Sequence, residues 1–464
     1  MELEQFVEKD LGHASYLVMS EATGEALVFD PRRDIDVYLD AERRLGARIV
    51  AVIDSHQHND YVSGILELAA RTGATTYASA LAQVRFAHEP LSDGDTLTFG
   101  ELSVTVVHTP GHTPEHVSLL LAEKADGAAI LLSGGALLVG DVARPDLLGG
   151  PKEKRAAARA LCQTLQNKVL PLDDHVLVYP THVAGSLCGG NIGSRFVTTI
   201  GYERKTNPLL AQVEARDVFV EECVRTDDLP AVPPYWSRLR LLNTDGALPA
   251  SPPREPRAFS AREVAAAIEG GAVVLDVRAP EAFAGGHIPE ALNAGLAGSF
   301  VTWAGTIVPP ERDLVLVLDR DEDVRHVTRN LLRIGFAAPL GWLAGGMLSW
   351  RVEGREITFV EQITAIELAR RRQEFAVLDV RQPAEWRSSR LEDAHWITGA
   401  QVAERLEEVP TGRVAVLCSS GYRSSAIASL LLHHGRPEVA NVLGGMRAWK
   451  AAGLPTLGSL EPDA

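Results

Sequence analysis

The chain has 464 residues and a formal net charge of −16, and 46% of its residues are hydrophobic. At roughly 100–200 residues per domain, this length accommodates about two to four domains with sizeable cores. The acidic balance argues against nucleic acid or an anionic membrane surface as the main partner. No apolar run approaches the roughly 18 residues of a membrane span, and the opening MELEQFVEKD is not a signal peptide.

Four cysteines are spread along the chain without a CxxC pair, which suits a reducing compartment and argues against a zinc ribbon or disulfide scaffold. They are Cys162, Cys188, Cys223 and Cys418. We therefore expect a cytoplasmic protein with neither nucleic acid nor a membrane among its partners. The sequence leaves the oligomeric state open, a homo-oligomer included.

The first part of the chain, residues 1–245, alternates short apolar strands with turns and a few helical segments. The helical candidates are residues 35–45, 65–71 and 153–166. The prolines of residues 246–257 (GALPASPPREPR) disfavour a regular element, so we expect an interdomain linker there.

An internal repeat follows the linker, with one copy in residues 258–356 and another in residues 357–464. The copies share the patterns VVLDVRAPEAF and AVLDVRQPAEW, and later GGMLSW and GGMRAW. In both, apolar strands alternate with helical segments, which indicates two small α/β domains with parallel sheets. The helical segments are residues 263–269, 324–334 and 424–434.

The segment IVAVIDSHQHNDYVSG, residues 49–64, is the first candidate site. Its β-branched run predicts a buried strand that ends in a loop carrying His56, His58 and Asp60. Three metal-capable side chains at alternate positions just past a strand end predict a metal site held by a rigid sheet. The alternative for this segment alone is a polar loop without a ligand.

Three further strands in the same part of the chain end in a ligand-type residue. LSVTVVHTPGHTPEH carries His112, ALLVGD carries Asp141 and HVLVYPTH carries His182. Together with His56, these residues are expected to converge at one edge of a sheet sandwich.

The motifs HQHND, TPGHT, GD and YPTH resemble those of the metallo-β-lactamase superfamily, which implies an αββα sandwich. The usual motif is HxHxDH, and here Tyr61 replaces the last histidine. In dinuclear members such as glyoxalase II that histidine holds a second metal, so its absence argues against a two-zinc hydrolase. DLGHASYLV, VFDPRRDID and ARPDL are more similar to the persulfide dioxygenase branch.

The resemblance implies one Fe(II) per chain, bound by His56, His112 and Asp141. Two imidazoles and one carboxylate with open positions are also the donor set of non-haem Fe(II) oxygenases. The remaining polar residues of the motifs would orient ligands and water around the metal. They are His58, Asp60 and His182.

Zinc is the alternative metal, bound by His56, His58 and His112 with a hydroxide in the fourth position, as in a glyoxalase II-like thioester hydrolase. Three residues are candidates for substrate binding: Tyr61, Arg144 and Cys188. Arg144 suits an anionic substrate, or else pairs with Asp146. Cys188 either takes part in persulfide handling or fills space as a small apolar residue.

The segment VAVLCSSGYRSSAIASLLLHHG predicts a strand, a tight loop and a helix, with Cys418 opening the loop. Loop amides, the helix N-terminus and Arg423 favour a thiolate there. With LDVR upstream and GGMRAW downstream, the segment resembles the rhodanese family. The resemblance implies that Cys418 carries sulfane sulfur as a persulfide, and that Asp379 and Arg381 brace the fold.

Residues 258–356 resemble the same family, but Asp319 in LVLVLD is expected at the position of Cys418. A carboxylate cannot accept sulfur. We therefore expect this repeat to be an inactive scaffold or docking domain.

The combined resemblance implies a persulfide dioxygenase–sulfurtransferase fusion of sulfide detoxification. Such a protein would oxidise a low-molecular-weight persulfide with O₂ to sulfite and thiol. Cys418 would then interconvert sulfite plus persulfide and thiosulfate. The rival from another class is a non-catalytic sulfur-carrier or sensor protein.

Overall fold

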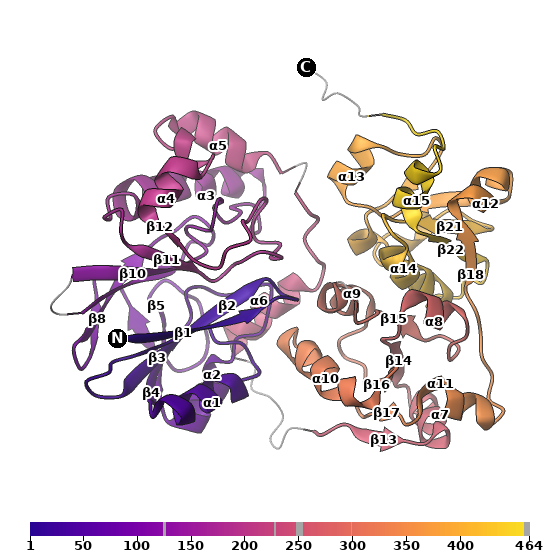
Figure 1. The fold of residues 1–464 in the computed structure, drawn as a ribbon, viewed down its shortest axis with the longest axis horizontal. Helices are drawn as coiled ribbons and strands as arrows, with labels where there is room; N and C mark the ends of the chain where they lie inside the picture. Colours follow the sequence, from indigo (N-terminus) through magenta and orange to yellow (C-terminus); the bar gives the residue numbers. More distant parts are fainter. Residues whose placement is uncertain (124–126, 227–228, 247–253, 298, 459–464) are drawn as a thin grey trace. The chain divides into compact units, whose positions relative to one another are not determined.

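The computed structural model describes residues 1–123, 127–226, 229–246, 254–297 and 299–458 (Figure 1). The chain forms two compact units, one from Met1–Thr226 with Trp236–Pro249 and the other from Asp227–Tyr235 with Ala250–Ala464. Most of the predicted linker, residues 247–253, lies outside the described residues. The domain boundaries drawn from the sequence therefore stay predictions.

Two mixed sheets form the first unit, each with six strands, in the orders β1-β2-β3-β4-β5-β6 and β12-β11-β10-β9-β8-β7. The strands of the first sheet are β1 (Glu2–Glu8), β2 (His13–Met19), β3 (Glu25–Phe29), β4 (Arg48–Ile53), β5 (Thr75–Ser79) and β6 (Glu89–Leu91). Those of the second are β7 (Thr96–Phe99), β8 (Leu102–His108), β9 (Val117–Glu123), β10 (Gly127–Gly134), β11 (Leu177–Pro180) and β12 (Thr198–Thr199).

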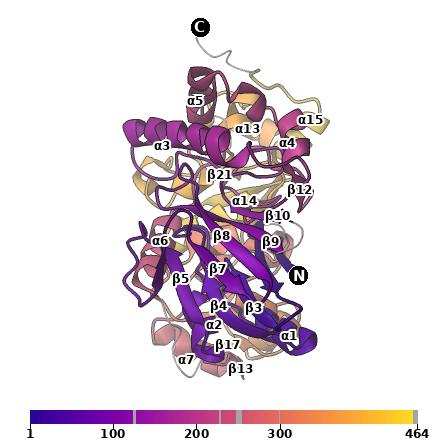
Figure 2. The same ribbon diagram turned by 90° about the vertical axis from the view of Figure 1, so that its left-hand side faces the viewer.

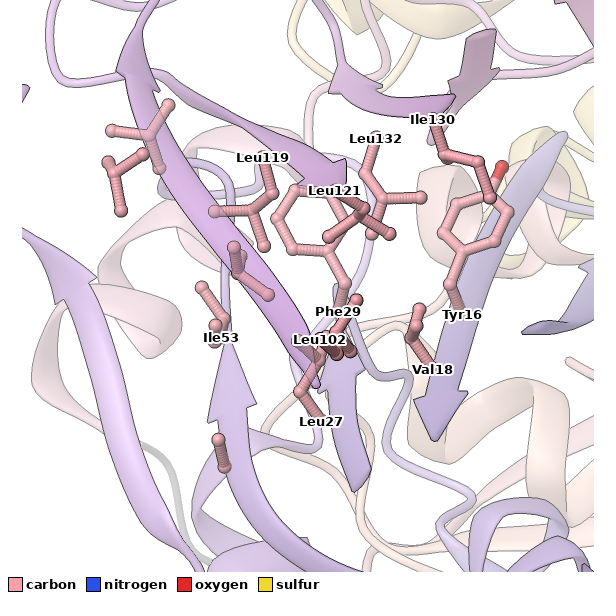
Figure 3. Packing of buried hydrophobic residues seen from close by; sticks show 14 of the residues in the cluster. Tyr16, Val18, Leu27, Phe29, Ile53, Leu102, Leu119, Leu121, Ile130 and Leu132 are labelled. Atoms are coloured by element: carbon pink, nitrogen blue, oxygen red, sulfur yellow. The ribbon is translucent and has the colours of Figure 1, made fainter. Parts of the chain in front are cut away.

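The core of this unit lies between the two sheets, where alternate side chains of facing strands pack together (Figure 3). Tyr16, Phe29 and Ile53 come from the first sheet, and Leu119 and Leu132 from the second. Burying side chains of this size contributes about 1.5–3 kcal/mol each. The strand ends that carry the predicted ligands are thereby held on a rigid frame.

Helices cover the outer faces of both sheets and complete the αββα arrangement. α1 (Asp36–Leu45) and α2 (Ile65–Thr72) pack on the first sheet, and α3 (Pro151–Thr164) and α5 (Arg216–Val224) on the second. Figure 2 shows α3 and α1 on opposite sides of the sandwich. The sequence analysis predicted α1, α2 and α3 but not α4 (Ile200–Thr206), α5 or α6 (Trp236–Asp245).

Two parallel five-stranded sheets form the second unit, in the orders β13-β17-β16-β14-β15 and β18-β22-β21-β19-β20. The identical strand order confirms the internal repeat. The first sheet has β13 (Arg257–Phe259), β14 (Val273–Asp276), β15 (Leu292–Asn293), β16 (Leu314–Val317) and β17 (Gly341–Leu343). The second has β18 (Glu361–Thr364), β19 (Ala376–Asp379), β20 (His395–Trp396), β21 (Val414–Leu417) and β22 (Val439–Leu443).

Four helices of each repeat correspond in order, whereas the helix Phe300–Ile307 of the first repeat has no α-helical counterpart among the described residues of the second. Those of the first repeat are α7 (Ala261–Glu269), α8 (Pro280–Ala284), α9 (Phe300–Ile307), α10 (Val324–Arg333) and α11 (Gly346–Val352). Those of the second are α12 (Ala365–Arg370), α13 (Pro383–Ser388), α14 (Tyr422–His433) and α15 (Gly445–Ala451). Among the described residues of the whole chain, no helix combines the length and apolar character needed to cross a bilayer.

The two repeats are joined through polar contacts between α14 and the end of β15. Tyr422 Oη donates a hydrogen bond to the Gly295 carbonyl at 2.6 Å, and Ser425 Oγ donates to Asn293 Oδ1 at 2.8 Å. The backbone amide of Asn293 donates a hydrogen bond to Ser429 Oγ at 2.9 Å. The repeat without a cysteine therefore contacts the helix that begins just after Cys418.

Candidate functional sites

Three buried imidazoles meet at one edge of the sandwich. His56 follows β4, His112 lies in the loop after β8, and His182 follows β11. The ring nitrogens that they offer to a metal lie within 4.8 Å of one another. Each Nε2 is buried and has no hydrogen-bond partner in the described part of the chain. Unpartnered buried nitrogens are costly unless they bind something, so this cluster fits a metal ion.

The other nitrogen of each ring is positioned by the fold. His112 Nδ1 donates to the Arg144 carbonyl at 3.0 Å, and His182 Nδ1 lies 3.4 Å from Asp60 Oδ2. His56 Nδ1 lies 2.8 Å from Ser55 Oγ. Metal-binding histidines use this arrangement, because a donor bond at Nδ1 leaves the Nε2 lone pair free.

Burial and the neighbouring imidazoles also keep His56 and His112 neutral. They lower the pKa of His56 well below its usual value and the pKa of His112 to about 3. Metal ligation requires the neutral imidazole, so these two rings are in the ligating state at neutral pH.

Asp141, predicted as the third ligand, is not grouped with His56 and His112 in this structure. Its Oδ2 accepts hydrogen bonds from the amides of Gly190 at 2.8 Å and Asn191 at 2.6 Å. The carboxylate therefore organises a loop, and His182 takes the place beside the two predicted ligands. The ligand role of Asp141 stays a prediction.

Gly135 explains why no side chain intervenes next to His112. It directly follows β10, and a Cβ on it would lie 2.7 Å from His112 Cδ2. Its amide donates to His116 Nε2 at 2.8 Å, and Thr109 Oγ1 lies 2.8 Å from His116 Nδ1. Both nitrogens of His116 are thus occupied, so this histidine supports the cluster without joining it.

His58, predicted to act around the metal or as a zinc ligand, belongs to a different group. Its Nε2 lies 3.2 Å from Asp30 Oδ1, and it clusters with Asp30 and Asp54. Although burial opposes protonation, Asp30 raises the pKa of His58. Asp30 also accepts hydrogen bonds from the amide and the hydroxyl of Ser55, which contacts His56. The sequence analysis missed Asp30.

Asp60 lies beside both His182 and Cys188. The Cys188 sulfur is 3.9 Å from Asp60 Oδ2, and these three residues form a second group of metal-capable atoms. Burial, and next Asp60, raise the pKa of Cys188 well above its usual value, so it is a thiol at neutral pH. Cys188 therefore lies next to His182 of the imidazole cluster as a neutral thiol.

The other two candidates for substrate binding are engaged within the protein. Arg144 donates to both carboxylate oxygens of Asp146, at 2.9 and 2.8 Å, which is the structural pairing considered as its alternative. Tyr61 is fully buried and donates to the Asp30 carbonyl at 3.3 Å. His13, which the sequence analysis did not single out, lies 4.1 Å from the Tyr61 ring between centroids. Neither His13 nitrogen has a hydrogen-bond partner among the described residues.

Cys418 stands directly after β21 in a loop that turns at Gly421, whose φ is 105°. Its sulfur accepts hydrogen bonds from the Gly421 amide at 3.1 Å and from Ser424 Oγ at 3.3 Å. Gly445 of the GGM motif packs under this loop, where a Cβ would lie 2.3 Å from the Cys418 carbonyl oxygen. The loop amide of Gly421 therefore points at the sulfur, as the strand, loop and helix pattern predicted.

The LDVR motif braces the fold, as predicted. Arg381 and Asp379 form a buried ion pair at 2.6 Å, and Arg381 also donates to the Ser389 carbonyl at 2.7 Å. Arg423, predicted to act with Cys418, is bound by Glu385. Glu385 lies 38 positions before Arg423 in the chain, and the sequence analysis did not find it.

The first repeat has no thiol at the position of Cys418, as expected. The residue at that position is Leu318, however, and not the expected Asp319. Asp276 pairs with Val317 between β14 and β16, just as Asp379 pairs with Leu417 between β19 and β21. The next residue is therefore Leu318 in one repeat and Cys418 in the other. The expected match with Asp319 is wrong by one position, because strand register, which the sequence did not reveal, sets the alignment.

Comparison with known proteins identifies relatives of both the sandwich and the two repeats. A family model described as the metallo-beta-lactamase superfamily matches residues 9–182, and a rhodanese-like domain model matches residues 260–353 and 364–452. Persulfide dioxygenase ETHE1 of Homo sapiens is 27% identical over 202 residues, covering 42% of this chain and 70% of that protein. A hydroxyacylglutathione hydrolase of Synechococcus sp. is 32% identical over 213 residues, covering 42% and 82%.

Among solved structures, a metallo-beta-lactamase from Staphylococcus aureus subsp. aureus COL is 28% identical with a TM-score of 0.65. The similarity covers 74% of this chain and 98% of that one. The matched share of this chain is larger than the share that forms the sandwich, so the structural similarity continues into the rhodanese-like repeats. The predicted fold class is thereby confirmed.

Proposed function

Because this chain is a member of the metallo-β-lactamase superfamily that carries two rhodanese-like domains, we propose that it couples persulfide oxidation to sulfur transfer. The substrate of the sandwich is a low-molecular-weight persulfide, which O₂ oxidises to sulfite and thiol. Cys418 of the last repeat interconverts sulfite plus persulfide and thiosulfate. The convergence of three unpartnered imidazole nitrogens carries the first half of this proposal.

Fe(II) is the metal we propose, held by His56, His112 and His182. Imidazoles suit iron, and an iron centre with open coordination positions supplies redox chemistry, whereas zinc is not redox-active. Asp60 faces His182 Nδ1 and keeps its ring oriented. Ser55, held by Asp30, does the same for His56.

The sulfur-transfer step uses groups that the Cys418 loop supplies. The thiolate, stabilised by the Gly421 amide and the Ser424 hydroxyl, attacks the outer sulfur of a persulfide. The sulfur–sulfur bond of the donor breaks, and its thiolate leaves with the electron pair. Sulfite then attacks the outer sulfur on Cys418, which releases thiosulfate and restores the thiolate.

Metal analysis and O₂ uptake test the proposal. After anaerobic purification, we expect about one iron per chain, and O₂ consumption with glutathione persulfide that yields sulfite. Cys418→Ser is expected to keep the O₂ consumption and to abolish thiosulfate formation. A variant that lost both activities would contradict the assignment of separate sites.

A zinc-dependent thioester hydrolase is the second candidate, favoured by the hydroxyacylglutathione hydrolase relative. Three imidazoles also form a catalytic zinc site when a water takes the fourth position. Bound zinc, hydrolysis of a glutathione thioester and no O₂ uptake would support this candidate. A sulfur-carrier or sensor protein would show neither activity.

A further inference from the structure

The arginine of the Cys418 loop is held by a carboxylate of its own repeat. Arg423 Nη1 and Nη2 donate to Glu385 at 2.6 and 2.7 Å. The two side chains are 20% and 33% exposed, whereas Cys418 is fully buried. The ion pair is therefore partly exposed to solvent, whereas the sulfur is not.

Arg423 interacts with the sulfur as well as with Glu385. Burial opposes its charge, but Glu385, and to a smaller extent Cys418, raise the pKa of Arg423. The guanidinium is therefore cationic and bound to Glu385, with the sulfur as its weaker partner.

Glu385 is itself fixed by the LDVR brace. Arg381 Nη1 donates to the Glu385 carbonyl at 3.1 Å, and Glu385 Oε2 accepts from the Gln382 amide at 3.0 Å at the start of α13. A chain of contacts thus runs from the buried Asp379–Arg381 pair to Cys418. The carboxylate cannot move away without disturbing the beginning of the helix.

The first repeat shows that this carboxylate is not needed for the fold. It keeps the same brace, with Arg278 Nη2 donating to Asp276 at 2.5 Å. Four residues after Arg278 stands Ala282, whereas four residues after Arg381 stands Glu385. The repeat with Leu318 in place of the thiol thus lacks the carboxylate too. The carboxylate at this position is thus present in the repeat that carries Cys418 and absent from the repeat that carries Leu318.

We propose that Glu385 determines which sulfur compounds Cys418 accepts, by competing with small oxyanions for Arg423. A dianion such as thiosulfate must displace Glu385 from the guanidinium or bind beside a carboxylate. An organic persulfide presents its outer sulfur to Cys418 and, unlike thiosulfate, carries no oxyanion group bonded to that sulfur. The site thus disfavours small dianions relative to organic persulfides. This inference rests on the proposed role of Cys418 as a sulfur carrier.

Glu385→Gln is the variant that tests this role. Glutamine at the third helical position keeps the capping hydrogen bond to the Gln382 amide and removes only the charge. Glu408→Gln is the matched control, because Glu408 binds Arg405 through two bonds of 2.6 Å in the same repeat. It contributes the same change in net charge without contact to Arg423.

Alkylation of Cys418 by iodoacetate and by iodoacetamide, followed by mass spectrometry, measures the charge preference directly. We expect the ratio of the anionic to the neutral rate to rise about tenfold in Glu385→Gln and to stay unchanged in Glu408→Gln. The KM for thiosulfate should fall by a similar factor, with a smaller change in kcat. A purely structural role for Glu385 would slow or speed both reagents alike.

An unchanged ratio in Glu385→Gln, or an equal rise in the control, would overturn the inference. So would a Cys418 that neither reagent modifies in any variant, because such a site admits no small anion. A protein that shows the expected ratios but transfers no sulfur would instead refute the proposed function and leave the charge preference intact.

Discussion

The imidazole cluster of the first unit and the cysteine loop of the second obtain their chemical groups in different ways. His56, His112 and His182 come from three separate strand ends, so the cluster exists only when the sandwich is assembled. The donors to the Cys418 sulfur belong to residues three and six positions further along the chain. One site depends on long-range packing and the other on local backbone geometry. Changes at each should therefore fail in different ways.

Replacing Cys418 by serine should have the largest effect. Loss of the nucleophile is expected to lower sulfur transfer from thiosulfate to cyanide by about 10⁴-fold or more, with the metal content unchanged. Cys162→Ala, in the layer between the second sheet of the sandwich and its covering helices, serves as the control. Residual transfer close to the wild-type rate would show that another group carries the sulfur.

The second largest effect is expected from removing the buried carboxylate charge of the LDVR motif. Asp379→Asn leaves Arg381 uncompensated in the interior, which should cost about 3–5 kcal/mol in the free energy of unfolding. Asp276→Asn should cost a similar amount in the other repeat, because its pairing with Arg278 is the same. Urea unfolding measures both. A large loss in only one repeat would mean that the braces are not equivalent.

His182→Asn should weaken metal binding by about 100-fold, as measured by titration of the metal-free protein. Asp141→Asn is the companion variant, and we expect it to retain the metal because its carboxylate accepts loop amides. Sulfur transfer by Cys418 should be unaffected in both. Metal loss in Asp141→Asn with retention in His182→Asn would restore the ligand set predicted from the sequence.

The smallest expected effect is the pH dependence of the Arg423–Glu385 pair. Burial raises the pKa of Glu385, but the hydrogen bonds and charge of Arg423 outweigh it and lower this pKa in the folded protein. A lowered pKa means that the pair stabilises the protein above the ordinary glutamate pKa of about 4.3, and that this is lost as the pH falls through the folded pKa.

The thermal midpoint of the wild type should therefore exceed that of Glu385→Gln at neutral pH, by the equivalent of at most about 1 kcal/mol. The difference should vanish in acid. A difference that persisted at pH 3 would indicate that the carboxylate charge is not its source.

Local patterns in the sequence were sufficient for most of the architecture. The period of apolar residues predicted α1, α2 and α3, and the repeated LDVR and GGM motifs predicted two equivalent domains. They did not reveal α5 and α6, whose apolar residues do not form one continuous face. The Cys418 loop was predictable because its geometry follows from neighbouring residues and one left-handed glycine, Gly421.

What the sequence by itself determined is therefore the paired parallel-sheet repeats and the Cys418 loop, which follow from short-range periodicity and turn residues, whereas the αββα sandwich was implied by the resemblance of its motifs to a known family. Only the tertiary structure placed His182 beside His56 and His112, matched Leu318 to Cys418, and joined Glu385 to Arg423. The physical reason is that side-chain direction at a strand end and strand register are set by partners distant in the chain. A shift of one residue exchanges which side chain faces the site.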